Sequence, residues 1–279
     1  MVERQAFALH DMPGNLDHGA YDPVIYERVE GVNILAIKPG EEADETIVVD
    51  AHHDTVRDSP GADDNTASVV ALLELAQVLA PSRFRRTIIL CATDMEELSF
   101  FGARALLAQL TRQRRIAGAI VLETMAYGSS EPNSQIVPPG VSQLYPQQVR
   151  RVARRQYRGD FTAVIYTGPA SALAISFGEG LAHCAGSDAP LLLRDPNDLP
   201  VAGPLLQRTL PVVRDFSRSN HVLFRAAGIP VLQITDTANF RNGNYHRATD
   251  TWDTLDYARL AAIVGATAIA VAQTAEMVE

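Results

Sequence analysis

Short runs of valine, isoleucine, leucine and alanine recur along the chain, each bounded by glycine, proline or charged residues. Such runs contain few polar residues, which is typical of strands buried on both faces of a mostly parallel sheet. The predicted strands are residues 32–37, 46–51, 87–92, 119–122 and 231–235.

Between these runs, apolar residues recur every three or four positions, which is the spacing of a buried helix face. The predicted helices are residues 67–79, 102–112, 145–158, 205–213, 220–227 and 255–277. Strands that alternate with helices favour an α/β fold in which helices cover both faces of the sheet. We therefore expect one domain over residues 1–279, a three-layer αβα structure with a mixed, mostly parallel central sheet.

The stretch from about 128 to 219 is less regular, and we expect it to form an irregular insertion in this domain. An insertion of this size can pack beside a substrate cleft and shape substrate choice, or be a peripheral excursion, and the two interpretations have similar weight. The pattern is broken by Pro132, Pro138, Pro139, Pro146, Pro196 and Pro200.

Composition narrows the class of protein. The formal charge of −9 argues against a nucleic-acid partner, because phosphate contacts require a concentrated basic face. Residues 1–15 lack the pattern of a signal peptide, and the longest apolar stretch, 260–272, is too short to span a membrane. Two cysteines form no disulfide framework. We expect a cytoplasmic protein without a membrane partner, although a secreted protein whose leader has been removed would leave the same record.

The segment His52-His53-Asp54 follows the predicted strand 46–51 directly. It therefore lies at a strand's carboxyl end, where open α/β sheets place ligand sites. Alternation along an extended segment sends His52 and Asp54 to one side and His53 to the other. His52 can then bind a metal while Asp54 orients its ring. Taken alone, such a triplet is more often a solvated strand end.

Asp63 and Asp64 lie in a turn that leads into the predicted helix 67–79. Aspartate is a preferred N-cap residue, so either one can serve the helix alone. Capping accounts for one aspartate and not for both. A carboxylate held there can also bridge two cations roughly 3.5 Å apart.

Three more candidate segments follow apolar runs. Glu96 and Glu97 come after strand 87–92, Glu123 ends strand 119–122, and His246 lies in a loop after strand 231–235. Adjacent glutamates point in different directions, so one can bind metal while the other acts as general base. Taken alone, a pair of glutamates or a loop histidine is usually a surface group. Glu123 has no local Lys or Arg partner in the sequence, and a bound metal would explain its position. Together, the five segments favour a hydrolytic site with two zinc ions.

These segments resemble the dizinc exopeptidases, the family that contains the bacterial leucyl aminopeptidases, plasma glutamate carboxypeptidase and, as one-zinc relatives, the glutaminyl cyclases. The resemblance covers roughly residues 30–275 and implies the zinc-exopeptidase fold. The matching segments are Val49-Asp50-Ala51-His52-His53-Asp54-Thr55, Pro60-Gly61-Ala62-Asp63-Asp64-Asn65, Glu96-Glu97-Leu98, Ser219-Asn220-His221, Ala227-Gly228-Ile229-Pro230, Tyr245-His246 and Asp250-Thr251.

The resemblance implies two Zn²⁺ ions per chain. One would be held by His52, Asp64 and Glu123, and the other by Asp64, Glu97 and His246, so that Asp64 bridges them. The family's order, Pro-Gly followed by two residues, selects Asp64 over Asp63. The family also often has a cis peptide after the bridging aspartate, which makes Asp64–Asn65 a candidate. Sites of this kind accept cobalt or manganese as well.

The resemblance also implies a mechanism for cleaving a peptide substrate. Glu96 would be the general base that deprotonates the attacking water and passes the proton to the leaving amine. Asp54 would orient His52, and Tyr245 would stabilise the tetrahedral oxyanion. Two positions depart from the usual pattern: Glu123 replaces a frequent aspartate, and Asn220 replaces the aspartate of a Ser-Asp-His segment.

The leading interpretation is a metal-dependent aminopeptidase, which is preferred over a carboxypeptidase only because aminopeptidases are more frequent in the family. A carboxypeptidase would need a cation for the substrate carboxylate, and Arg214, Arg218, Arg241 and Arg247 are candidates. The motifs are also compatible with a one-zinc transferase of the glutaminyl-cyclase type and with an inactive homologue. The sequence leaves the oligomeric state open.

Overall fold

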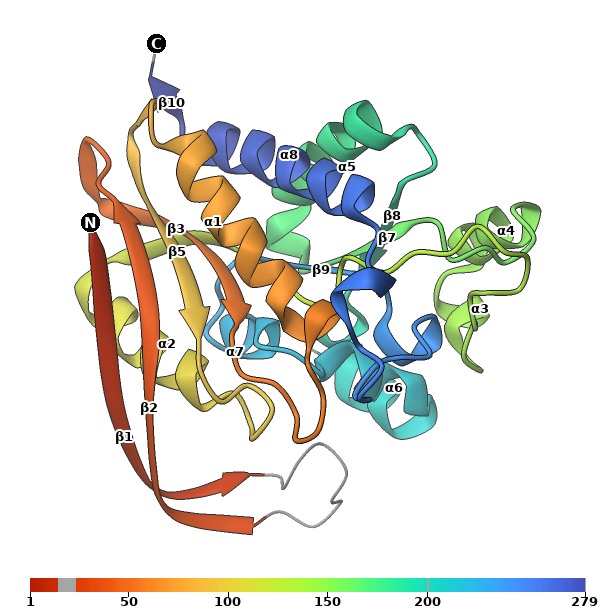
Figure 1. Cartoon of the computed structure of the whole chain (residues 1–279), viewed down its shortest axis with the longest axis horizontal. Coiled ribbons are helices and arrows are strands. Elements are labelled where there is room, and N and C mark those ends of the chain that lie inside the picture. The colour runs from red at the N-terminus through yellow and green to blue at the C-terminus, as the bar shows by residue number, and fades with distance from the viewer. Residues whose placement is uncertain (15–23, 200, 279) are drawn as a thin grey trace.

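The computed structural model describes residues 1–14, 24–199 and 201–278. Its main feature is one eight-stranded sheet flanked by helices (Figure 1). The strands of this sheet are β1 (Val2–Gly14), β2 (Val24–Lys38), β3 (Glu42–His52), β5 (Arg86–Thr93), β6 (Arg115–Leu122), β7 (Thr162–Tyr166), β8 (Pro190–Arg194) and β9 (Val231–Thr235). A separate two-stranded sheet pairs β4 (Arg83–Phe84) with β10 (Met277–Val278).

The strand order is β1-β2-β5-β3-β6-β9-β7-β8. The four central strands β5, β3, β6 and β9 run parallel, and so do β7 and β8. The pairs β1–β2, β2–β5 and β7–β9 are antiparallel. The expected mixed, mostly parallel sheet is therefore confirmed.

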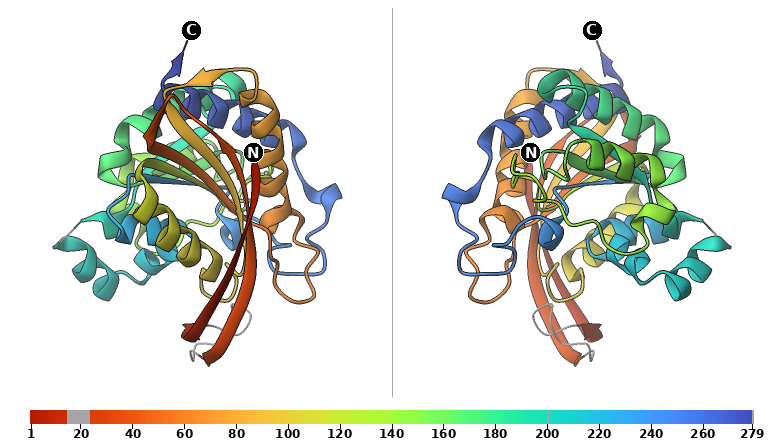
Figure 2. Two further views of the ribbon diagram at one scale, coloured as in Figure 1. Left: turned by 90° about the vertical axis from the view of Figure 1, so that its left-hand side faces the viewer. Right: turned by 90° about the vertical axis from the view of Figure 1, so that its right-hand side faces the viewer.

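Helices cover both faces of the sheet (Figure 2). The helices are α1 (Ala67–Leu79), α2 (Phe101–Gln113), α3 (Val141–Leu144), α4 (Pro146–Arg154), α5 (Ser171–Ala185), α6 (Ala202–Thr209), α7 (His221–Ala226) and α8 (Tyr257–Thr274). Successive residues of β3 show how the two faces are covered: Ile47 and Val49 pack in the core under α1, α5 and α8, whereas Val48 packs under α2 and α7. All three side chains are fully buried.

The stretch 128–219 is more regular than the sequence pattern indicates, because it contributes β7, β8 and α5 to the main sheet and its helical layer. Both strands have only five residues, and Gly178 and Gly180 lower the helix propensity of α5. Gly180 lets α5 pack closely against α8, since a Cβ atom there would lie 3.2 Å from the Cα atom of Ala266 on α8. Pro138, Pro139, Pro146 and Pro196 instead fall in the segments around α3, α4 and α6.

The N-terminal segment forms a long antiparallel hairpin, β1–β2, that extends beyond the rest of the sheet (Figure 1). Helix α8 is longer than the apolar stretch 260–272, and it is long and apolar enough to cross a membrane by length and composition alone. In this structure, however, Leu260, Ile263 and Val271 are buried in the core with residues of α1 and α5. Helix α8 is therefore a core helix of the fold.

Candidate metal centre

The carboxyl ends of the parallel strands meet at one edge of the sheet and bring the distant acidic and histidine segments together. His52 ends β3 and lies opposite Thr93, the last residue of β5. Glu123 directly follows β6, and its backbone amide donates to the Ile234 carbonyl of β9 at 3.0 Å. Topology thus gathers, at one edge, residues that are far apart in sequence.

Two groups of side chains converge there. In one, His52 Nε2 lies 3.1 Å from Asp64 Oδ1 and 3.4 Å from Glu123 Oε1. In the other, His246 Nε2 lies 3.0 Å from Asp64 Oδ2 and 3.7 Å from Glu97 Oε1. Within each group, the potential ligand atoms all lie within 4.8 Å of one another. Asp64 turns one carboxylate oxygen towards each group, which is the geometry of a bridging ligand.

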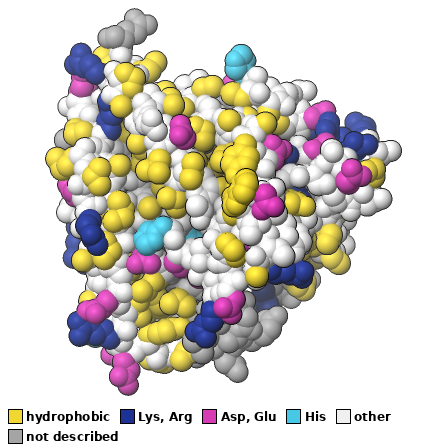
Figure 3. Space-filling view, in the orientation of Figure 1, with side chains coloured by type: hydrophobic (Ala, Val, Ile, Leu, Met, Phe, Trp, Pro, Cys, Tyr) yellow, Lys and Arg dark blue, Asp and Glu magenta, His cyan; other side chains and the backbone are white. Residues whose placement is uncertain are grey.

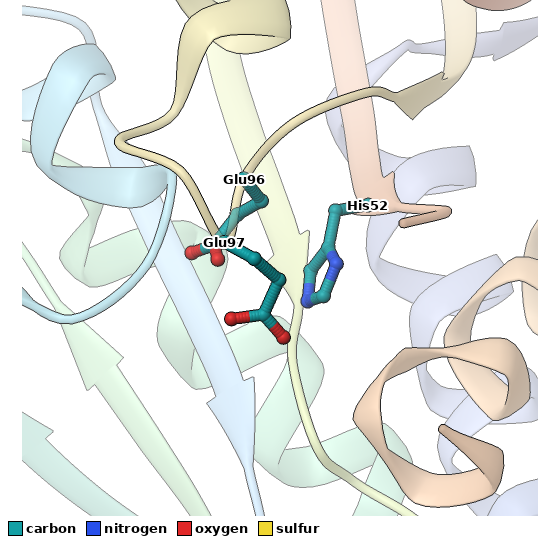
Figure 4. A group of neighbouring side chains, drawn as sticks. All are labelled: His52, Glu96 and Glu97. Atoms are coloured by element: carbon teal, nitrogen blue, oxygen red, sulfur yellow. The ribbon is translucent and has the colours of Figure 1, made fainter. Parts of the chain in front are cut away.

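Glu96 lies next to these two groups. Together with His52 and Glu97 it forms a third cluster of ligand atoms within 4.8 Å of one another. Figure 4 shows that both glutamates extend from the loop after β5 towards the space that the His52 ring also faces. Glu96 is only 2% exposed. A carboxylate so placed is close enough to the ligands to exchange a proton with a molecule bound between them.

Asp54 contacts both His52 and the backbone of the two glutamates. Its backbone carbonyl lies 3.0 Å and its Oδ1 atom 3.4 Å from His52 Nδ1, so a proton on Nδ1 leaves the Nε2 lone pair directed at the cluster. The Asp54 carboxylate also accepts the backbone amides of Glu96, at 3.0 Å, and Glu97, at 3.1 Å. His53 is exposed and faces the Val32 carbonyl instead.

The turn before α1 presents Asp64 to both histidines. Helix α1 begins at Ala67 without a side-chain cap, so neither aspartate serves as its N-cap. Asp63 is instead buried, where it accepts the Ala126 amide at 2.8 Å and Asn242 Nδ2 at 2.9 Å. The Asp64–Asn65 peptide is cis, as the resemblance led us to expect.

Asp250 joins the turn to the loop that carries His246. Its carboxylate accepts the backbone amides of Asp63, at 3.0 Å, and Asp64, at 3.2 Å. Its own carbonyl accepts the amide of Ala62 at 3.1 Å. The sequence placed Asp250 in a motif without giving it a role, because its partners are nearly two hundred residues away.

Two further supports surround Glu123. Ser219 donates its hydroxyl proton to Glu123 Oε2 at 2.7 Å. Asn65 contacts the residues on either side of Glu123: its Nδ2 donates to the Leu122 carbonyl at 2.9 Å, and its Oδ1 accepts the Thr124 amide at 3.2 Å. Both residues lie in the motifs recognised in the sequence, but only the structure shows that they position Glu123.

Asn220, which replaces the usual aspartate, contacts a buried carboxylate beneath His52. Its Nδ2 donates to Asp50 Oδ2 at 2.9 Å, and the Thr93 hydroxyl donates to Asp50 Oδ1 at the same distance. Burial raises the pKa of Asp50 to about 6, although these two hydrogen bonds lower it. An amide is therefore suited to this position, where a second carboxylate would face the first.

Tyr245 lies beside the second histidine. Its ring stacks on the His246 imidazole, with centroids 3.7 Å apart, and its hydroxyl accepts a hydrogen bond from Arg218 Nη2 at 3.1 Å. Burial, followed by the charge of Asp64, raises the pKa of Tyr245 well above its usual range. Its hydroxyl thus stays protonated and available as a donor.

The electrostatics fit a cation. Burial alone would lower the pKa of His52, but the carboxylates of Glu123, Asp54 and Asp64 raise it well above its usual value. Burial alone would raise the pKa of Asp64, but His246 and His52 lower it below its usual range. Several buried carboxylates around two imidazoles favour bound positive charge, and imidazole and carboxylate are ligands that zinc accepts.

The face of the molecule shown in Figure 3 carries charged side chains of both signs. On the face shown in Figure 3, the basic side chains drawn in colour lie in small separate groups among acidic and hydrophobic ones. Phosphate backbones are usually bound by a concentrated basic face. Among the residues coloured on that face, no such concentration is visible.

The αβα sheet with imidazole and carboxylate groups at its carboxyl edge defines a zinc-exopeptidase fold. Residues 33–168 and 200–271 match the model of peptidase family M28. The chain belongs to peptidase family M28. This family assignment agrees with the resemblance found in the sequence motifs.

Individual relatives were found by sequence and by structure. The chain is 33% identical to the uncharacterized protein YfbL of Escherichia coli over 78% of its own length and 64% of the relative's. Its fold resembles a zinc aminopeptidase from Bacillus subtilis (TM-score 0.62, 21% identity), covering 88% of this chain and 50% of that one. It also resembles a glutaminyl cyclase from Fimbriiglobus ruber (TM-score 0.56, 15% identity), covering 97% and 81%. The chain therefore spans less than two thirds of YfbL and half of the Bacillus enzyme.

Proposed function

We propose that this protein is a zinc-dependent exopeptidase that binds two zinc ions per chain and acts as an aminopeptidase. The observation that carries the proposal is that two groups of potential ligand atoms share the Asp64 carboxylate. Within each group these atoms lie within 4.8 Å of one another. Membership of peptidase family M28 supports a peptide substrate. The fold's similarity to zinc aminopeptidases supports the choice of metal and of the amino-terminal end.

Each residue of the site has a separate role in this proposed reaction. His52, Asp64 and Glu123 would hold one zinc ion and Asp64, Glu97 and His246 the other, and the bound ions would supply Lewis acidity for the scissile carbonyl and for the attacking water. Glu96 takes the proton from the attacking water and delivers it to the departing amine. Tyr245 donates a hydrogen bond to the developing oxyanion. Asp54 keeps His52 in the required tautomer and holds the backbone of Glu96 in place.

A carboxypeptidase is a second candidate, because one of the four arginines considered borders the pocket beside the site. Arg218 lines that pocket together with Tyr245. Arg241 is buried and committed to Gln135 and Phe161, while Arg214 and Arg247 are exposed. If the substrate's carboxylate binds here, Arg218→Gln should raise KM for free peptides and not for their C-terminal amides. The matched control is Arg214→Gln.

A transferase of the glutaminyl-cyclase type shares the fold and uses one zinc ion. Both ligand groups are retained in this chain, which favours two ions and a hydrolase. Counting zinc per chain distinguishes the two functions, since the exopeptidase should bind two ions and the cyclase one. An inactive homologue is disfavoured because Glu96 and the five ligands are all present.

The decisive experiment uses a pool of peptides that are free, N-acetylated or C-terminally amidated, with mass spectrometry of the products. Wild-type protein should shorten free and amidated peptides from the N-terminus and leave acetylated ones intact. Glu96→Gln should abolish this activity, whereas the exposed Glu179→Gln should not. Loss of C-terminal residues would support the carboxypeptidase. Hydrolysis by Glu96→Gln at the wild-type rate would refute the mechanism.

We also propose that the protein acts in the cytoplasm without a nucleic-acid or membrane partner. The support is the charge of −9 and the presence of two free cysteines, of which Cys91 is buried and Cys184 exposed. Free thiols are typical of a reducing compartment. Recovery of the native protein in the soluble cytoplasmic fraction is the expected result of cell fractionation.

A further inference from the structure

A cavity of about 140 Å³ opens beside the metal centre. Glu123, Tyr245 and Arg218 are among the residues that line it, so whatever fills the cavity adjoins the proposed site. Strands β7, β8 and β9, helix α4 and the 3₁₀ segment Pro211–Ser217 all contribute residues to its wall. For comparison, an apolar protein cavity of about 150 Å³ holds a benzene molecule. The cavity therefore has the size of one aromatic ring.

The wall is mainly apolar and includes several rings. Tyr145, Phe161, Phe216 and Phe240 all line the cavity. Aromatic side chains favour an aromatic guest, because offset and edge-to-face ring pairs add to the gain from burial. A charged side chain would lose its hydration on entering such a space. The walls thus favour a ring without charge.

Among the described residues, one polar atom in the wall of the cavity lacks a hydrogen-bond partner. Gln233 is 6% exposed and lines the cavity, yet its Oε1 atom has no hydrogen-bond partner among the residues that the structure describes. Gln135 in the same wall is different, because it donates to Thr237 and accepts from Arg241. Native proteins rarely leave a buried carboxamide oxygen without a partner. Gln233 is therefore positioned to meet a polar group on a guest.

The register of the sheet gives the depth of Gln233. It lies on β9 opposite Val121 of β6, two residues before Glu123. Two residues of a strand span about 7 Å, so Gln233 lies about that far along the sheet from Glu123, the proposed metal ligand. A tyrosine side chain has that reach. A ring that enters beside Glu123 can therefore bring a hydroxyl at its far end to Gln233.

We propose that the cavity receives the side chain of the substrate's terminal residue and that Gln233 makes it selective for tyrosine over phenylalanine. This inference rests on the proposed exopeptidase function. A carboxamide both donates and accepts, so it satisfies a phenolic hydroxyl in either orientation of its O and N atoms. Phenylalanine fills the same space but leaves Gln233 buried and unpaired. Sites built to bond a hydroxyl reject analogues that lack it.

The first test compares dipeptides that differ only in a terminal tyrosine or phenylalanine. For wild-type protein we expect kcat/KM to be at least roughly tenfold higher for tyrosine, a modest part of the discrimination that such sites reach. Gln233→Met, which keeps the length and removes the hydrogen bonds, should bring the ratio to about one or below. Gln147→Met, an exposed glutamine on α4, should leave it unchanged.

The second test needs no catalysis. Binding of p-cresol and of toluene to the Glu96→Gln protein is measured by calorimetry. We expect p-cresol to bind at least roughly tenfold more tightly, and the difference to vanish when Gln233→Met is added. Equal binding of the two compounds would overturn the inference. Because both comparisons can be made with Gln233 intact, the test remains informative if the Met variant fails to fold, and Gln233→Leu then replaces it.

The outcomes separate the two proposals. If wild-type protein hydrolyses no peptide, the proposed function fails, whatever the calorimetry shows. If it hydrolyses peptides but treats tyrosine and phenylalanine alike, the selectivity of Gln233 is refuted and the exopeptidase stands. A tyrosine preference that survives in Gln233→Met would also refute the role of Gln233.

Discussion

The carboxylate of Asp250 accepts the backbone amide of Asp64 at 3.2 Å, across 186 positions of the sequence. This contact ties the residue shared by both ligand groups to the loop that carries His246. A carboxylate that accepts backbone amides fixes the position of the segment that donates them. Asp250 is therefore a positioning residue for two proposed ligands at once.

We expect Asp250→Ala to weaken zinc binding by roughly 10- to 100-fold, the usual effect of removing a group that orients metal ligands. The measurement is competition with a zinc chelator, with circular dichroism to show that the fold is retained. Asp253→Ala is the matched control, because Asp253 lies three residues further along the chain and is exposed. Equal affinities for the two variants would contradict the role of Asp250.

The two ligand groups predict how many ions each variant binds. Wild-type protein should contain two zinc ions per chain, and His246→Ala should retain one, because only the second group includes His246. The exposed His53→Ala variant should keep both. Elemental analysis after dialysis against buffered zinc measures the stoichiometry. One ion in the wild-type protein would instead favour the cyclase-like function.

Tyr245→Phe should lower kcat by about 10²-fold, the lower end of the loss caused by removing an oxyanion donor, with little change in KM. The aromatic ring and its stacking on His246 remain in this variant, so metal binding should be unchanged. Steady-state kinetics with a good peptide substrate measures both constants. Tyr257→Phe, which alters an exposed tyrosine on α8, is the control. An unaltered kcat would exclude Tyr245 from catalysis.

His221 predicts a loss of stability in mild acid. Burial lowers its pKa from 6.5 to about 4, while its Nε2 faces the Phe216 carbonyl at 2.9 Å. Between these values the unfolded chain takes up a proton that the folded chain does not, so folding stability falls as the pH falls from 6.5 to 4. At about 1.36 kcal/mol per pKa unit, the loss is at most about 3 kcal/mol.

The measurement is urea unfolding at pH 7 and pH 4.5. His221→Gln, whose side-chain amide can still donate to Phe216, should lose less stability between the two pH values than wild type does. His183→Gln, at an exposed position of α5, is the control and should behave like wild type. The same loss in wild type and His221→Gln would show that other groups cause the acid sensitivity.

Local patterns in the sequence were sufficient for much of the fold. A strand covered on both faces is largely apolar, so β3, β5, β6 and β9 can be recognised as apolar runs without knowledge of their neighbours. The ends of those runs then show where His52, Glu96 and Glu123 lie. Helix α1 matches its predicted range, 67–79, because its buried positions recur with helical spacing.

Some elements escaped this reasoning. Strands β7 and β8 are too short to give a clear pattern, and the two glycines of α5 have a meaning only beside α8. The edge strand β1 is largely exposed, so its residues do not form an apolar run. In each case the contact that stabilises the element lies elsewhere in the chain.

The sequence by itself determined the αβα class, the central strands and, through a family resemblance, the candidate ligands, because burial and motif order leave a local record. The tertiary structure decided that His52 and Glu123 meet, that Asp63 and Asp64 do not cap α1, and that Asp250 and Ser219 support the ligands. The tertiary structure also revealed the cavity that Gln233 lines. These relationships depend on strand order and register, and hydrogen bonds between distant segments follow only once the sheet has set which backbones lie side by side.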